Sequence, residues 1–176
     1  MQSHDVVATV NLARAYNLTS ILPVALFECC QLPRGEFIDP VRYGEGADDS
    51  EQLSSADIRL CLRARDTLTE RSHWLRWLLL DDDKWDDAEE PCQAPVECRL
   101  SRSEIVCTLA TLAPPTPFHS TNPLARIDDD VDAVISSSGF HLCDSCVHIY
   151  RTLHAAQRKA VWDGLGKVFG VEGWPQ

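Results

Sequence analysis

Four cysteines constrain this chain more strongly than any other feature, because they stand in two pairs at the predicted starts of two separate helices. One pair is Cys92 and Cys98; the other is Cys143 and Cys146, more than thirty residues further along the chain. Four thiolates around one tetrahedral ion form the common structural zinc site, and the positive end of a helix favours thiolates. The pattern therefore predicts one structural zinc ion that pins the two helices together.

The spacing of these cysteines leaves alternatives open. Five residues separate Cys92 from Cys98, which is wider than the usual gap of roughly two to four, whereas Cys143 and Cys146 have the spacing of a zinc knuckle. His141 could replace one cysteine as a ligand. Cys98 and Cys146 could instead point into an apolar core. Cys143 and Cys146 could also form a redox pair, although such a pair normally accompanies a βαβ pattern that this chain lacks.

Apolar residues recur at helical spacing along most of the chain, and no segment alternates convincingly like a strand. The prediction is an all-α fold: an irregular domain of about five to seven helices with long loops, braced by the zinc site. Residues 1–32 are expected to form a helix pair and residues 53–176 a helical C-terminal region, together one compact unit, 1–176. The predicted helices lie within 6–17, 21–30, 54–78, 95–112, 122–138, 143–160 and 161–170.

Local signals place several of these boundaries. Thr19 is predicted to cap the second helix, and Ser54 with Asp57 three residues later resembles a capping box. Pro95 suits a first helical turn, where a missing N–H is tolerated, and Pro114, Pro115 and Pro117 are predicted to end that helix. Two segments rich in Gly, Pro or acidic residues, 33–52 and 81–90, are predicted to be loops.

Charge and motifs narrow the classes of function. A formal charge of −11 argues against nucleic acid and anionic membranes as partners, since phosphates need clustered cations. No apolar run approaches the ~20 residues of a membrane helix, and residues 1–5 lack the start of a signal peptide. The expected location is therefore intracellular, where disulfides are uncommon. No nucleophile elbow, dinucleotide fingerprint or phosphate loop occurs, so the chain is predicted not to be an enzyme.

The tryptophans support two different predictions, packing in the core and binding of a partner. Trp162, with Phe169, fits the apolar face of a helix and is predicted to lie in the core. Trp74 and Trp77 are three residues apart, and a small domain does not easily bury both. One of them could anchor a protein partner, because tryptophan is enriched among binding hot spots. Plain packing in the core is the favoured prediction for them.

Residues 6–30 contain Leu12-Ala13-Arg14-Ala15-Tyr16, followed by a turn and a second apolar helix, and they resemble the helical end of a BTB/POZ domain. The remainder resembles the C-terminal region of BTB-domain proteins of mushroom-forming fungi. The motifs that carry this resemblance are Leu53-Ser54, Leu62-Arg63-Ala64-Arg65-Asp66 with Leu68, Cys98-Arg99, Leu142-Cys143-Asp144-Ser145-Cys146, Val161-Trp162-Asp163-Gly164-Leu165 and Val168-Phe169-Gly170-Val171.

The resemblance implies a protein–protein interaction module with an adaptor-like role, because BTB proteins self-associate and many present substrates to cullin-based ubiquitin ligases. The mixed sheet and the dimer surface of the BTB core are missing, so we expect a fragment, an incomplete gene product or a degenerate copy. The function predicted from the sequence is a non-enzymatic module that binds protein partners. The alternatives are a thiol–disulfide redox protein using Cys143 and Cys146, and a remnant that folds only marginally.

Overall fold

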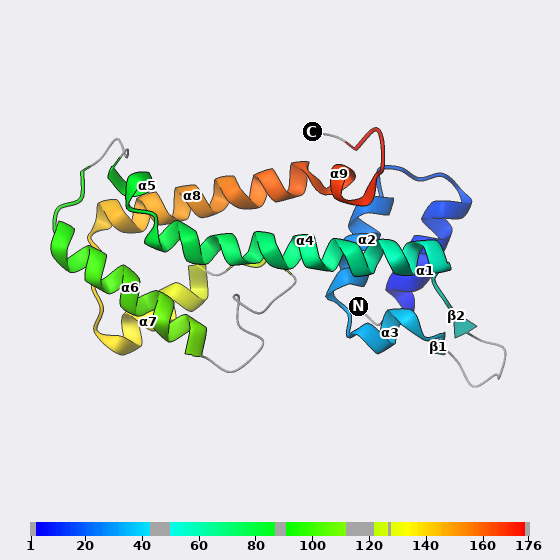
Figure 1. Cartoon of the computed structure of the whole chain (residues 1–176), viewed down its shortest axis with the longest axis horizontal. Coiled ribbons are helices and arrows are strands. Elements are labelled where there is room, and N and C mark those ends of the chain that lie inside the picture. The colour runs from blue at the N-terminus through cyan, green and yellow to red at the C-terminus, as the bar shows by residue number, and fades with distance from the viewer. Residues whose placement is uncertain (1–2, 43–49, 87–90, 112–121, 127, 175–176) are drawn as a thin grey trace. The chain divides into compact units, whose positions relative to one another are not determined.

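The computed structural model describes residues 3–42, 50–86, 91–111, 122–126 and 128–174 (Figure 1). These residues form nine helices and one two-stranded sheet, in the order α1 (Ser3–Ala15), α2 (Leu22–Gln31), α3 (Arg34–Ile38), β1 (Val41–Arg42), β2 (Ser50–Glu51), α4 (Ser55–Leu80), α5 (Asp82–Asp86), α6 (Pro95–Thr111), α7 (Asp128–Ser138), α8 (Asp144–Asp163) and α9 (Leu165–Phe169). The all-α fold class is confirmed. Three helices have only five residues each, and the six longer ones agree with the five to seven expected.

The chain divides into two compact units. Residues Met1–Leu68 together with Trp162–Gln176 form what we call the terminal unit, and Thr69–Val161 form the central unit. The four cysteines of the predicted zinc site all belong to the central unit.

The core of the terminal unit is built on α1, α2 and the C-terminal helix α9. On α1, Val6, Val10 and Ala13 are buried at helical spacing. Most of α2 is buried, and its Pro23 lies in the first turn as the sequence predicts. Helix α9 packs against α2 and buries Leu165 and Phe169, so the end of the chain completes the core begun at its start.

The structure corrects two predictions in this unit. Thr19 does not cap α2: a turn at 17–21, with Asn17 in the left-handed region at a φ of 52°, delays the helix until Leu22. The segment 33–52 was expected to be a loop, yet it contains α3 and the antiparallel pair β1–β2. Phe37 of α3 is fully buried, and tertiary packing therefore decides the conformation of this short segment.

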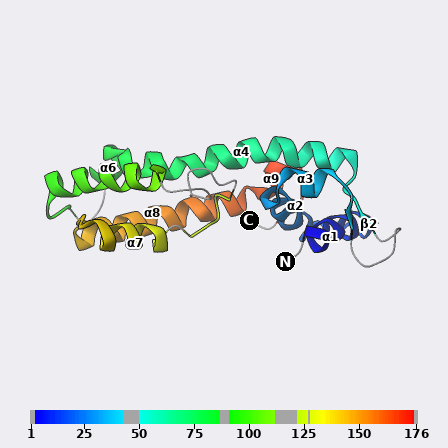
Figure 2. The same cartoon turned by 90° about the horizontal axis from the view of Figure 1, so that it is seen from below.

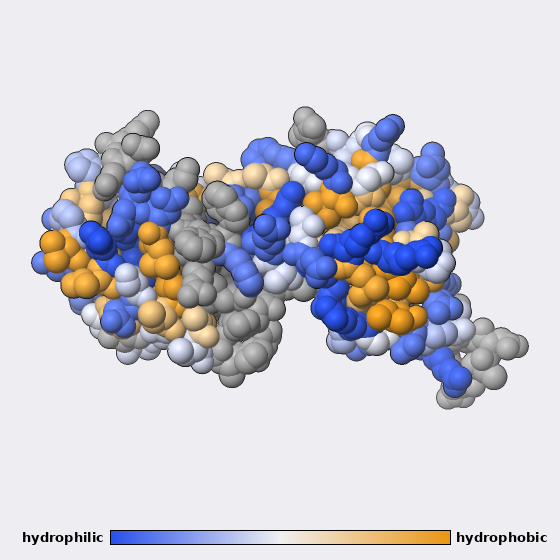
Figure 3. All heavy atoms as spheres, in the orientation of Figure 1, coloured by the Kyte–Doolittle hydropathy of each residue, from blue (hydrophilic) through white to orange (hydrophobic). Residues whose placement is uncertain are grey.

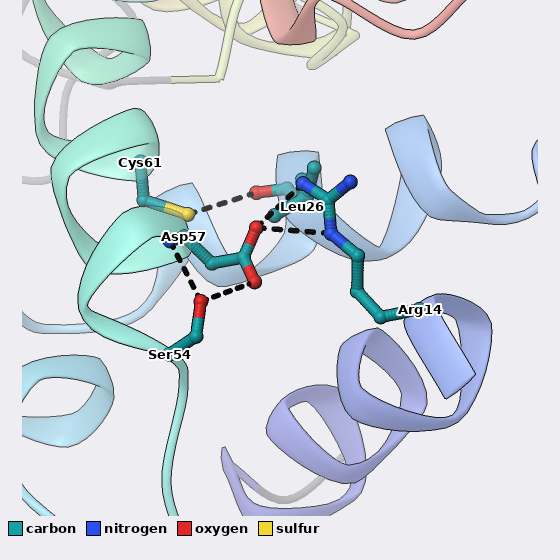
Figure 4. Close-up of polar contacts among 5 residues, drawn as sticks. All are labelled: Arg14, Leu26, Ser54, Asp57 and Cys61. Carbon is teal, nitrogen blue, oxygen red and sulfur yellow. Dashed lines mark hydrogen bonds and ion pairs between the residues drawn. The ribbon is translucent and has the colours of Figure 1, made fainter. Parts of the chain in front are cut away.

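The N-cap that the Ser54–Asp57 pattern predicts at the start of α4 is confirmed (Figure 4). The backbone N–H of Asp57 donates to Ser54 Oγ at 3.1 Å, and the Ser54 hydroxyl donates to Asp57 Oδ2 at 2.8 Å. The buried Asp57 carboxylate also pairs with the guanidinium of Arg14, at 2.6 Å from Nη2. The thiol of Cys61 faces the carbonyl oxygen of Leu26 at 4.0 Å. The first turns of α4 are thereby joined to both α1 and α2.

The core of the central unit gathers side chains from five helices, of which α6, α7 and α8 contribute most. Figure 2 shows the ribbons of these three helices from below. Its buried members are Leu79, Trp85, Cys98, Ile105, Val106, Leu109, Val131, Val134, Cys146, Ile149 and Tyr150. Trp85 belongs to α5, which forms inside the segment 81–90 that was expected to be a loop. Two of the four predicted ligands, Cys98 and Cys146, are thus core residues.

Trp162 corrects a further prediction, since its side chain is 43% exposed rather than in the core. Its ring instead contacts Trp174 edge-on, with 5.3 Å between the ring centroids. The side chains of Trp74 and Trp77, the three predicted helix-ending prolines, and loop residues 43–49 and 87–90 lie outside what the structure describes. Among the described helices, none combines the length and the apolar character needed to cross a bilayer.

Candidate metal centre

The four predicted cysteines come together in the structure. The Sγ atoms of Cys92, Cys98, Cys143 and Cys146 all lie within 4.8 Å of one another. The Sγ of Cys92 is 3.4 Å from that of Cys146 and 3.8 Å from that of Cys143. Zinc–sulfur bonds of ~2.3 Å in a tetrahedron separate the sulfurs by roughly 3.8 Å. The cluster therefore has the dimensions of a four-thiolate metal site.

The starts of two helices position these sulfurs. Helix α8 begins at Asp144, so Cys143 stands at its N-cap and Cys146 at the third helical position. Helix α6 begins at Pro95, and the backbone N–H of Cys98 closes its first turn on the carbonyl oxygen of Ala94 at 2.9 Å. Cys92 lies in the segment before α6 and Cys98 in the first turn of α6, and both sulfurs reach the cluster. This explains how the wide gap between the two cysteines is accommodated.

Backbone N–H groups converge on the sulfurs. The N–H of Cys143 donates to Cys98 Sγ at 3.3 Å. Burial alone would raise the pKa of the Cys143 thiol, but hydrogen bonds from the backbone N–H groups of Cys146 and Gln93 lower this pKa to about 6. Cys143 is therefore prepared to act as a thiolate, the form in which cysteine binds metals.

The two deeper cysteines differ from Cys143. Desolvation by burial raises the pKa of the Cys98 and Cys146 thiols, and both side chains are 2% exposed. Cys92 and Cys143 are half-buried. A cation would have to be present for the two buried thiols to lose their protons, because an isolated buried charge is costly. The arrangement as a whole can hold a soft divalent metal.

The remaining cysteines lie outside this cluster. Cys29, Cys30 and Cys61 are fully buried in the terminal unit, and desolvation raises the pKa of Cys29 well above its usual range. Cys107 is exposed on α6. His141 is exposed, and its backbone N–H donates to Ser101 Oγ at 3.3 Å; the metal-competent group found among the described residues consists of the four cysteines.

One residue beside the cluster was not anticipated from the sequence. Arg102 is buried on α6 and lines the same cavity as Cys92, Cys98 and Cys146. The available signal was its position four residues after Cys98, which places both on one side of the helix. A basic residue at that spacing is normally read as a solvated surface charge.

Comparisons with known proteins do not place this chain in a family: neither the protein-family models, nor the curated proteins, nor the solved structures contain a match.

Proposed function

We propose that this protein is a non-enzymatic, intracellular interaction module whose central unit is held together by one structural zinc ion. The observation that carries the proposal is the convergence of four cysteine sulfurs within 4.8 Å of one another. Thiolate ligands in a tetrahedral set favour zinc over hard cations such as magnesium or calcium. Four protein ligands leave no open position for water or substrate, which supports a structural rather than a catalytic role.

The place of the cluster in the fold supports the same role. Cys98 and Cys146 belong to the hydrophobic core of the central unit, and the cluster joins the first turns of α6 and α8. A metal bound there would crosslink two helices whose ligands are 45 to 54 residues apart in sequence. Because such a site does not exist in the unfolded chain, its binding free energy contributes directly to folding.

Metal content tests this proposal. Protein purified without chelator is expected to carry about one zinc per chain by elemental analysis, and removing the metal with a chelator should reduce the helical circular dichroism signal. The reason is that metal binding at a closed thiolate site and folding are coupled. Readdition of zinc should restore the signal. Metal-free protein whose helix content does not respond to chelator or zinc would contradict the proposal.

A second candidate function, thiol–disulfide exchange by Cys143 and Cys146, is favoured by the low pKa of Cys143, since reactive thiols carry depressed pKa values. Alkylation distinguishes the two functions. A zinc site should resist iodoacetamide until the metal is removed. A redox pair should instead react at once after treatment with dithiothreitol, independently of chelator.

The interaction role is supported by the resemblance to BTB-domain proteins and by exposed apolar side chains. In the terminal unit, Leu12 on α1, Tyr16 directly after α1, and Leu18 and Ile21 in the following turn are 40–72% exposed. In the central unit, apolar side chains gather over the first turns of α6 (Figure 3), where Val96 and Leu100 are 68% and 64% exposed. Exposed apolar groups of this kind are common at sites of protein contact.

A comparison of two double variants tests the interaction role. Leu12→Ala with Tyr16→Ala removes apolar surface at the end of α1, and Val96→Ala with Leu100→Ala removes it from α6. In crosslinking experiments with extract of the source organism, one double variant should lose a partner that the wild type and the other variant retain. Recovery of the same proteins by all three forms would argue against a specific interaction surface at either place.

A further inference from the structure

A cavity of about 410 Å³ lies beside the four cysteines, and three of them, Cys92, Cys98 and Cys146, contribute to its walls. Arg102 lines the same cavity. Its residue is only 6% exposed, whereas arginine is seldom buried to this degree unless it is paired. The question is why a buried guanidinium lies beside the four cysteines.

The known contacts of Arg102 do not fully satisfy it. Its Nη2 donates to Asp82 Oδ1 at 2.6 Å, and the guanidinium lies over the ring of Trp85, 4.3 Å from the centroid. Its Nε and Nη1 atoms are buried and have no hydrogen-bond partner among the residues that the structure describes. Unpaired donors on a buried charged group are costly. Arg102 therefore has two N–H donor groups that could still interact with a negatively charged neighbour.

Asp82 neutralises the positive charge of Arg102 only in part. Asp82 is shared, because Arg99 Nε also lies 3.4 Å from its carboxylate, and the Asp82 side chain is 44% exposed and therefore partly hydrated. Zinc bound to four thiolates carries a net charge of about −2. Burying such a charge is unfavourable unless cations lie nearby. The positive charge remaining at Arg102 is opposite in sign to the charge of the proposed zinc–thiolate centre and would compensate part of it.

We propose that Arg102 is a positioning residue that compensates the negative charge of the zinc–thiolate centre. This inference rests on the proposed zinc site. Arg102 follows Cys98 by four residues and so projects from the same side of α6. Trp85 and Asp82 hold its guanidinium in place, which lowers the entropic cost of ordering it. Residues that support metal ligands in this way commonly change metal affinity by about 10–100-fold.

Zinc affinity of three full-length variants tests the assignment. Arg102→Met keeps an unbranched apolar stem but removes the charged guanidinium, and it should weaken zinc binding about 10–100-fold in competition with a chromophoric chelator. Arg102→Lys should restore part of the loss. Arg99→Met is the matched control, because Arg99 also contacts Asp82 from α6 but its side chain is 72% exposed; its affinity should stay within about threefold of the wild type.

The metal-free proteins separate charge compensation from a purely structural role. Without metal there is no zinc–thiolate charge to compensate and a buried cation is unfavourable, so metal-free Arg102→Met should unfold at the same urea concentration as metal-free wild type, or a higher one. Equal losses of stability with and without zinc would overturn the assignment, as would wild-type zinc affinity in Arg102→Met. A wild type that binds no zinc would instead refute the zinc site itself.

Discussion

Replacing Cys98 by serine is expected to remove zinc from the protein and to expose the backbone amides of the central unit to hydrogen exchange. Serine is a poor ligand for zinc, and structural zinc sites contribute apparent binding free energies of about 10 kcal/mol or more at neutral pH. That value is comparable to the whole stability of a typical domain. Hydrogen exchange followed by mass spectrometry should show the largest loss of protection in α6 and in the first turns of α8.

Two controls test whether the effect of Cys98→Ser is specific to loss of the metal. Cys107→Ser changes an exposed cysteine on the same helix and should leave zinc content and protection unchanged. Wild-type protein treated with chelator should reproduce the exchange pattern of Cys98→Ser, while residues 3–38 in the terminal unit retain their protection. If Cys98→Ser and Cys107→Ser bound zinc equally well, Cys98 would not be a ligand.

Replacing Phe37 by alanine is expected to destabilise the terminal unit by about 3–5 kcal/mol. The Phe37 side chain is 1% exposed, and the guanidinium of Arg65 lies 5.6 Å from its ring centroid. Truncation would leave a cavity and remove this cation–π contact, worth about 0.5–1 kcal/mol or more. The free energy of opening can be measured from hydrogen exchange of the amides of α2.

The neighbouring Ile38 supplies the control. Its side chain is 36% exposed on the same short helix, so Ile38→Ala should cost about 1 kcal/mol or less. Losses of equal size for the two variants would show that α3 does not anchor the core through Phe37.

The sequence predicted those features that short-range signals determine. The Ser54–Asp57 capping box and Pro95 each marked a helix start that the structure contains. The four cysteines were identified from their chemistry, because two pairs of soft ligands at helix starts have few other uses. Their mutual distances depend on tertiary packing and required the structure.

Features that depend on long-range packing were missed. Helix α3 has five residues, which is too few for a periodic apolar pattern, and burial of Phe37 stabilises it. Trp162 matched the helical period of the core yet is exposed, because the period identifies one face but not whether another element covers it. The role proposed for Arg102 depends on the charges of neighbours up to twenty residues away, such as Asp82.

The sequence distance between the paired ligands has a consequence for how the site assembles during synthesis. The sulfur of Cys98 meets the backbone of Cys143, 45 residues later in the chain. At about 5–20 residues per second, the first two thiols emerge from the ribosome roughly 2–9 s before the last two. During this interval Cys92 and Cys98 have no closed site, and both oxidants and competing metals can reach them. Correct metallation therefore depends on the redox state of the compartment in which translation occurs.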